Sequence, residues 1–223
     1  MDRPADNSPL SFPHTWRAEI LTGPPLIAPA RQFTYPHAVA GEEDALARGA
    51  LQLLVHPAKN SEADVRVAHS SRDLSRAISA ENTAPFLATC ALGFTDPSMP
   101  TGLYSCPNPQ ELCAVAGGYA YIIDSTAPQR STHVPLRPVT EVVVIPEPAL
   151  LLFAGFHSIV AWGAEGLAWQ TARLSWEGLR LTGVSTGPDV APVLYGLGWN
   201  LHTDKEVAFA VDLRTGTHTG GGF

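Results

Sequence analysis

Eight histidines are the side chains best able to hold a metal ion or act as general bases in this chain of 223 residues. They are His14, His37, His56, His69, His133, His157, His202 and His218. None stands in an HxH, HxxxH or HExxH spacing, which would bring two imidazoles to one ion. The sequence therefore predicts no structural metal.

The stretch from His202 to Glu206 has two interpretations. It joins two expected strands, so an ordinary solvated hairpin loop explains it. A hydrolase or metalloenzyme site would need His202 and Asp204 to meet a third group from elsewhere, such as His218 or Asp212. No spacing selects that third group.

Other catalytic patterns are missing from the sequence. It has no GxSxG elbow and no GxxxxGK[ST] phosphate loop, and the Gly-rich stretch 215–222 is typical of a tail. Adjacent Glu42 and Glu43 fit the start of a helix, where acids interact favourably with the helix dipole. The sequence therefore predicts no catalytic residues and no cofactor. Catalytic groups gathered from distant loops would escape this search.

The cysteines favour a reducing compartment. Cys90, Cys106 and Cys113 are an odd set without CxxC spacing, so we expect buried free thiols. The alternative is a disulfide between Cys106 and Cys113 across the Pro107–Pro109 turn. The first 14 residues contain three prolines and no apolar run of secretory length, so the expected location is cytoplasmic.

Aromatic residues supply the best candidates for binding. Trp176 and Trp199 lie beside expected turns, and with Tyr195 they could stack a sugar or grip another protein. If a turn is centred on Ala164 and Glu165, Trp162 and Trp169 share one face of a hairpin that is covered on both sides. We interpret these two tryptophans as core, and an exposed aromatic platform is the alternative.

The elements that must position these residues are strands. The chain has 20 Pro and 19 Gly, which interrupt long helices and exclude helical bundles and coiled coils. Apolar runs between Gly, Pro and Asp turns predict about ten strands after Pro85. They are expected near Phe86–Phe94, Leu112–Ala116, Tyr119–Asp124, Val139–Ile145, Leu150–Ala154, Ser158–Trp162, Leu167–Leu174, Gly178–Val184, Val193–Trp199 and Glu206–Leu213.

The first 80 residues are less regular, and we divide the chain into a flexible leader, 1–14, and one β-rich domain, 15–223. Prolines between Thr15 and Tyr35 predict edge strands or a wrapping arm. A short helix is expected between Glu42 and Arg48, and a buried strand over Ala50–Val55. Residues 59–82 are a polar insertion with a possible strand at Val65–Ala68 and a helix begun by Ser70 or Ser71.

A faint repeat links two expected hairpins. Cys113-Ala-Val-Ala-Gly117 matches Leu151-Leu-Phe-Ala-Gly155 in character, with Ala116 and Ala154 separated by 38 residues (154 − 116). A third, weaker match to this repeat lies at Val193-Leu-Tyr-Gly196. A period near 40 is typical of a β-propeller blade.

Two segments strengthen this pattern. Ala161-Trp-Gly-Ala-Glu-Gly-Leu-Ala-Trp-Gln-Thr171 and Val211-Asp-Leu-Arg-Thr-Gly216 resemble the strand-turn-strand segments of PQQ-type and WD40-type propeller blades. The resemblance covers residues 112–216 and implies a propeller-like fold, without implying a particular chemistry. Three such units are fewer than a closed propeller needs, so a partial propeller, a β-sandwich and a ring completed by oligomerisation stay open.

Charge narrows the class of partner. The net charge is −7 with only two lysines, Lys59 and Lys205, so we expect neither nucleic acid nor an anionic membrane as partner. The sequence predicts an all-β, non-catalytic protein that recognises another protein through loops and exposed aromatics. An inhibitor-like or immunity-like role against a basic partner is compatible with the charge. A small-ligand or carbohydrate binder is the alternative, with Trp176, Trp199, Tyr195, His202 and Asp204 as binding residues.

Overall fold

The computed structural model describes residues 10–36, 46–58, 83–187 and 190–222. Its regular elements are sixteen strands in four sheets of four, which confirms the all-β class. Of the helix expected between Glu42 and Arg48, only the end falls within these ranges, where Leu46 and Ala47 are helical. The expected strand at 65–68 and the helix begun by Ser70 or Ser71 lie outside the described residues.

The four sheets follow one another along the chain. Sheet A has the order β1 (Trp16–Leu21), β3 (Ala50–Pro57), β4 (Phe86–Ala91), β2 (Arg31–Tyr35). Sheet B is β5 (Gly102–Ser105), β6 (Glu111–Ala116), β7 (Tyr119–Asp124) and β8 (Ser131–His133). Sheet C is β9 (Glu141–Ile145), β10 (Leu150–Ala154), β11 (Ile159–Gly163) and β12 (Gly166–Gln170). Sheet D is β13 (Leu179–Gly187), β14 (Val190–Asn200), β15 (Lys205–Asp212) and β16 (His218–Gly220).

Sheets B, C and D are antiparallel meanders, and sheet A departs from this order. Of the two alternatives for the stretch between Thr15 and Tyr35, edge strands or a wrapping arm, the structure forms edge strands, β1 and β2. β2 pairs with β4 in parallel, whereas β1 pairs with β3 antiparallel. Before β1, Phe12 is buried, and its amide donates to Ser105 Oγ at 2.9 Å.

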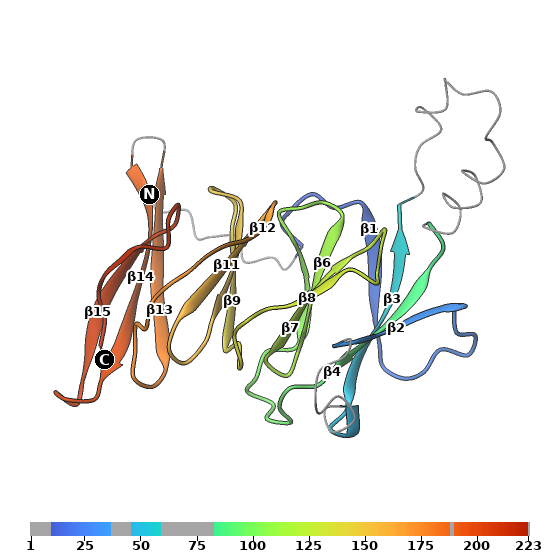
Figure 1. Ribbon diagram of the computed structural model, residues 1–223, viewed down its shortest axis with the longest axis horizontal. Helices are drawn as coiled ribbons and strands as arrows, with labels where there is room; N and C mark the ends of the chain where they lie inside the picture. The colour runs from blue at the N-terminus through green and yellow to red at the C-terminus, as the bar shows by residue number, and fades with distance from the viewer. Residues whose placement is uncertain (1–9, 37–45, 59–82, 188–189, 223) are drawn as a thin grey trace.

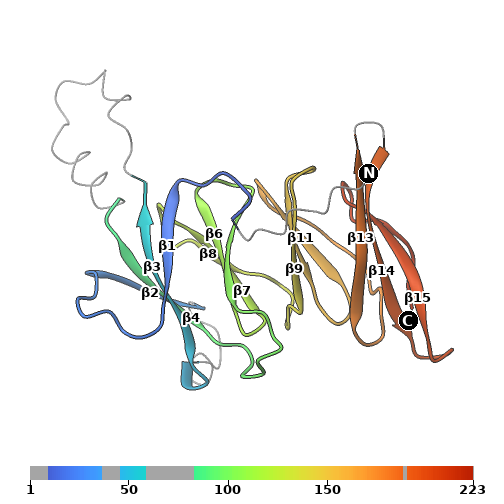
Figure 2. The ribbon, with the colours of Figure 1, turned by 180° about the vertical axis from the view of Figure 1, so that it is seen from behind.

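The sheets stand face to face in one row, with sheet A and sheet D at opposite ends of the long axis (Figures 1 and 2). Each neighbouring pair encloses one apolar cluster, A with B, B with C and C with D. No apolar cluster of the described residues joins sheet A to sheet D. The architecture is thus an open row of blade-like sheets, and the expected three units are corrected to four.

The sequence repeat coincides with these sheets. β6 ends at Ala116 and β10 at Ala154, so the matched segments are the second strands of sheets B and C. The third strands of sheets B and D end at Asp124 and Asp212, whose Oδ1 atoms accept backbone N–H groups of the next turn. The Asp-x-x-Thr-Gly segment therefore forms the β15–β16 turn, as the resemblance implies.

Two expectations need correction. The expected strands do not include β5, β8 and β16, because each has only three or four residues and none carries an apolar run. The stretch 215–222, interpreted as a tail, contains β16.

The strands expected within Val139–Leu174 are confirmed as β9 to β12, all paired antiparallel.

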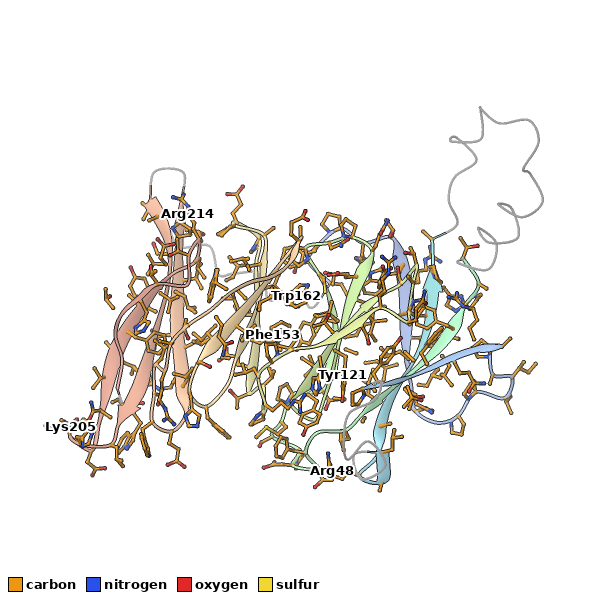
Figure 3. All side chains as sticks on the ribbon, in the orientation of Figure 1. Arg48, Tyr121, Phe153, Trp162, Lys205 and Arg214 are labelled. Atoms are coloured by element: carbon orange, nitrogen blue, oxygen red, sulfur yellow. The ribbon has the colours of Figure 1, made fainter. Side chains whose placement is uncertain are left out.

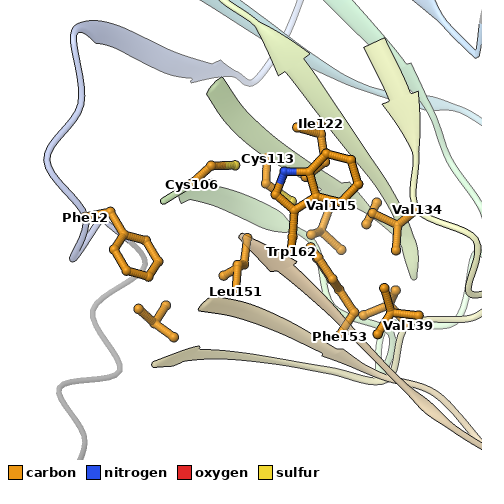
Figure 4. Packing of buried hydrophobic residues seen from close by; sticks show 13 residues of the cluster. Phe12, Cys106, Cys113, Val115, Ile122, Val134, Val139, Leu151, Phe153 and Trp162 are labelled. Atoms are coloured by element: carbon orange, nitrogen blue, oxygen red, sulfur yellow. The ribbon is translucent and has the colours of Figure 1, made fainter. Parts of the chain in front are cut away.

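Trp162 and Trp169 are buried as expected, but they face opposite sides of sheet C. Trp162 lies opposite Leu167, whereas Trp169 lies opposite Ala161 instead of the expected Val160, because a bulge shifts the register between Ala161 and Trp162. One extra residue turns the following side chains to the other face. Trp162 therefore packs between sheets B and C (Figure 4), and Trp169 between sheets C and D.

Tryptophan N–H groups link each sheet to its neighbour. Trp16 Nε1 of sheet A donates to the Glu111 carbonyl of sheet B at 3.0 Å, and Trp162 Nε1 of sheet C donates to Glu111 Oε2 at 3.0 Å. Trp169 Nε1 donates to the Leu213 carbonyl beside sheet D at 2.9 Å. These bonds combine with apolar packing to fix the spacing of the row.

The three thiols are free and buried, so Cys106 and Cys113 form no disulfide. Cys106 and Cys113 lie in the cluster between sheets B and C (Figure 4), and Cys90 lies between sheets A and B. Burial raises the pKa of each thiol, so all three stay protonated and unreactive.

Candidate functional site

The topology gathers six loops at one end of the row, which we call the connector end. β6, β10 and β14 end there, and the links from each sheet to the next pass through it. The loops are 92–101, 117–118, 134–140, 155–158, 171–178 and 201–204. Figure 3 shows Arg48 and Lys205 at this end and Arg214 at the opposite one, the hairpin end.

Large apolar side chains are exposed at the connector end. Phe94, Phe156 and Trp176 keep 40%, 40% and 41% of their surface in solvent, and Leu201 of the β14–β15 turn is also exposed. The three aromatics come from three different loops, 92–101, 155–158 and 171–178. Phe156 and Trp176 line one cavity, and Phe94 lies at the same end of the row. Exposed aromatics on separate loops are typical of binding surfaces.

One set of side chains, the Tyr119 cluster, combines Phe94, Tyr119, His133 and Arg137. Phe94 meets Tyr119 edge to face, with ring centroids 5.9 Å apart, and the Arg137 guanidinium lies 5.3 Å from the Tyr119 centroid. Arg137 Nη2 is 2.8 Å from His133 Nδ1. Because arginine only donates, Nδ1 accepts and the remaining proton of the neutral ring is on Nε2.

His133 is held in its neutral form. Burial, and secondly the neighbouring Arg137 cation, lower the pKa of His133 from 6.5 to about 4. Its ring stacks on Tyr121 with centroids 4.7 Å apart, and its Nε2 is buried without a hydrogen-bond partner among the described residues. A positive charge on this ring would face both a cation and an apolar core.

A second set, the Trp176 cluster, repeats the arrangement between sheets C and D. The Arg173 guanidinium lies 4.6 Å from the Trp176 ring centroid, and Arg173 Nη2 is 3.2 Å from His157 Nδ1. Arg173 Nε also donates to the Ser175 carbonyl at 3.1 Å, which holds the guanidinium in place. With Phe156 and Glu177 these residues line an open cavity of about 300 Å³.

The structure brings four of the predicted binding residues to the same place. The Trp176 amide donates to the Trp199 carbonyl at 2.8 Å, so these two residues are joined. His202 and Asp204 lie in the turn directly after β14, where the His202 amide donates to Asn200 Oδ1. Tyr195 lies further along β14, on the face of sheet D that points away from sheet C, and is 45% exposed.

His218 and Asp212 are not near this turn. His218 pairs with Val211, and β15 separates that position from Lys205 by about 20 Å of strand. No group of three or more His, Cys, Asp or Glu side chains in the described ranges has the geometry of a metal site. The structure therefore does not assemble the His202, Asp204 and His218 site.

The sequence interpretation missed Phe94, Phe156, Arg137 and Arg173. Phe94 and Phe156 each follow a glycine within three residues of the end of a strand, a shared Gly-Phe signal that could have nominated both. The arginines carried no signal, because nothing in their own segments shows that Arg137 lies over Tyr119 of β7 or that Arg173 lies beside His157 of the β10–β11 loop.

Among the described residues, no helix is long and apolar enough to cross a membrane. Comparison with protein-family models and with curated proteins finds no match for this chain.

Proposed function

We propose that this is a non-catalytic binding protein that recognises another protein through its connector end. The observation that carries the proposal is the exposure of Phe94, Phe156 and Trp176 on three loops of the connector end. Aromatic residues dominate the affinity of many protein interfaces because they bury large rigid surfaces at low entropic cost.

The two arginines support the same proposal. Arg137 and Arg173 are each held against an aromatic ring and a histidine, so they are ordered before a partner arrives. Ordered arginines lose little entropy on binding and donate to carbonyl or carboxylate oxygens of a partner. The net charge of −7 would speed the encounter with a basic partner, and such an encounter weakens as salt increases.

The test uses the wild type and two single variants as bait in cell extracts. The proteins that each bait captures are quantified by mass spectrometry. Trp176→Ala is expected to reduce capture of the partner by at least about 10-fold, since truncating a central aromatic typically costs 1–2 kcal/mol or more. Leu167→Ala is the matched control, because Leu167 is 51% exposed but lies near the hairpin end. It should capture as much partner as the wild type. If every protein captured by the wild type is equally captured by Trp176→Ala, the proposal fails.

A small ligand is the second candidate, favoured by the cavity of about 300 Å³ at the Trp176 cluster. Phe156 and Trp176 offer apolar surfaces, while Arg173 and His157 offer donors to a carboxylate or hydroxyl group. Calorimetric titration with a panel of mono- and disaccharides and aromatic carboxylates tests it. We expect a bound compound to lose affinity about 10-fold or more in Trp176→Ala and none in Leu167→Ala. Equal affinity for both variants would place the ligand elsewhere.

A further inference from the structure

The cavity at the Trp176 cluster combines a cation with apolar rings in a small volume. Phe156 and Trp176 supply exposed aromatic surface, Arg173 and His157 supply nitrogen donors, and Glu177 completes the lining. The volume of about 300 Å³ corresponds to the share of about ten water molecules in the liquid. The cavity therefore has room for the last residue of a chain or for a small molecule, and not for a whole strand.

Arg173 is held in place without a carboxylate. Its Nε donates to the Ser175 carbonyl at 3.1 Å, and its Nη2 lies 3.2 Å from His157 Nδ1 and 3.5 Å from the Trp176 carbonyl oxygen. These bonds use Nε and Nη2, so both N–H groups of Nη1 remain without an acceptor among the described residues. Neither ion pair of the described residues includes Arg173, so its positive charge has no carboxylate partner there.

His157 adds a second donor to the same cavity. Because Arg173 Nη2 donates to His157 Nδ1, the proton of the neutral imidazole is on Nε2. Nε2 forms no hydrogen bond with the described residues, since both contacts of this ring are made by Nδ1. A guanidinium N–H and an imidazole N–H are therefore available for the two oxygens of one carboxylate, and the charge of the guanidinium strengthens the bond.

The surroundings favour a ligand with a single negative charge. Glu177 lines the same cavity, and the chain as a whole carries −7. Repulsion from these charges makes a second negative charge on the ligand costly, which favours a carboxylate over a phosphate or a dicarboxylate. The Glu177 carboxylate can also accept an N–H group of the ligand, and a peptide bond supplies one.

A carboxylate beside an apolar group is typical of the end of a polypeptide. In a C-terminal residue the carboxylate and the side chain leave the same Cα atom, so both fit within one small cavity. The side chains of Asp and Glu carry a carboxylate on little apolar surface, and they would leave the rings of Phe156 and Trp176 in water. Capture of a C-terminal carboxylate is one of the recurring modes of peptide recognition.

We propose that the Trp176 cluster binds the C-terminal carboxylate of the partner protein, with an apolar last residue against Phe156 and Trp176. Arg173 supplies the charge, and His157 supplies the second donor. This inference rests on the proposed recognition of a protein at the connector end and names the part of the partner that is bound. A small free acid offers the same chemistry, and the experiment distinguishes the two sources.

The test titrates the full-length protein with the N-acetylated peptide Gly-Ser-Gly-Phe, ending either in a free carboxylate or in an amide. NMR spectra follow the indole N–H signals of the five tryptophans, and the signal of Trp176 is assigned from its loss in Trp176→Phe. The acid should shift the Trp176 signal with a dissociation constant on the order of 0.1–1 mM, as expected for contacts of one residue. The amide should bind at least about 10-fold more weakly, because it loses the charge-assisted hydrogen bonds. Replacing the last residue of the peptide by Gly should also weaken binding about 10-fold, because the rings stay uncovered.

Three variants assign the carboxylate to its donor. Arg173→Gln should weaken binding of the acid at least about 10-fold and remove the difference between acid and amide. Arg173→Lys keeps the charge without the planar fork and should lie between Arg173→Gln and the wild type. Arg214→Gln removes the same charge at the hairpin end and is the matched control, which should bind as the wild type does (Figure 3). Thermal melts verify that all variants fold.

Equal affinity for acid and amide overturns the proposal, and so does a Trp176 signal that the acid leaves unshifted at about 10 mM. An affinity for the acid that Arg173→Gln does not change has the same consequence. None of these results affects the proposed function, which fails only if Trp176→Ala captures every protein that the wild type captures.

Capture from cell extracts separates the two sources of the carboxylate. Arg173→Gln should lose the same proteins as Trp176→Ala, and removing the last residue of such a protein should reduce its capture about 10-fold or more. If Arg173→Gln captures them as the wild type does and still binds the acid peptide more weakly, the ligand is a small free acid and the polypeptide source is wrong.

Discussion

Trp169→Ala is expected to lower the free energy of unfolding by about 3–5 kcal/mol, enough to unfold a domain of ordinary stability. The indole is 8% exposed and packs in the cluster between sheets C and D. It lies directly over Gly216, where a Cβ atom would come within 2.7 Å of the ring. The substitution removes this packing and also leaves the Leu213 carbonyl without its donor.

Trp199→Ala is the matched comparison, with an expected cost of about 1 kcal/mol, because its indole is half-buried on the side of sheet D that points away from sheet C. Trp169→Phe separates packing from hydrogen bonding and should cost about 1–2 kcal/mol. Denaturant titrations compare the three variants at one protein concentration. Equal and small effects of Trp169→Ala and Trp199→Ala would mean that the C–D interface is not a core.

His133 is expected to make the protein less stable as the pH falls below about 6.5. The pKa of His133 is about 4 in the folded chain, against 6.5 without these neighbours, so the unfolded chain takes up the proton first. The stabilising contribution is therefore complete above pH 6.5 and is lost as the pH falls toward 4. The difference between the pKa of His133 in the folded and the unfolded chain corresponds to about 3 kcal/mol of unfolding free energy. Because the ring keeps some contact with solvent, we expect roughly 1–2 kcal/mol.

His133→Phe tests this because phenylalanine keeps the stacking on Tyr121 and cannot titrate. Glu111 and Glu141 oppose the effect, since burial raises the pKa of both carboxyl groups and the folded chain then binds their protons more readily. The quantity to measure is therefore the difference in unfolding free energy between wild type and His133→Phe at about pH 7 and about pH 4. Arg137→Gln should reduce the pH dependence in part, because the guanidinium is the second cause of the lowered pKa. A difference that does not change with pH would show that His133 is not the titrating group.

Local patterns were sufficient for most strands. β7 and β10 have the predicted bounds, because each is a continuous apolar run between turn residues. The repeat that joins Ala116 to Ala154 also identified second strands of successive sheets correctly. β5, β8 and β16 escaped prediction because an edge strand of three or four residues is specified by its neighbour in the sheet rather than by its own side chains.

Which side of a sheet a residue faces, and which residues meet at the candidate site, depended on contacts between residues far apart in the sequence. The sequence alone determined that Trp162 and Trp169 are buried, because apolar residues flank both, but only the bulge at Ala161 decided that they serve different interfaces. Exposure of Trp176 could be predicted from its turn, whereas the contact of its neighbour Arg173 with His157 depends on the pairing of β11 with β12, which brings loops 155–158 and 171–178 together. The number of sheets and the open ends were likewise decided by tertiary structure, because whether a sheet face is covered depends on which other sheet packs against it.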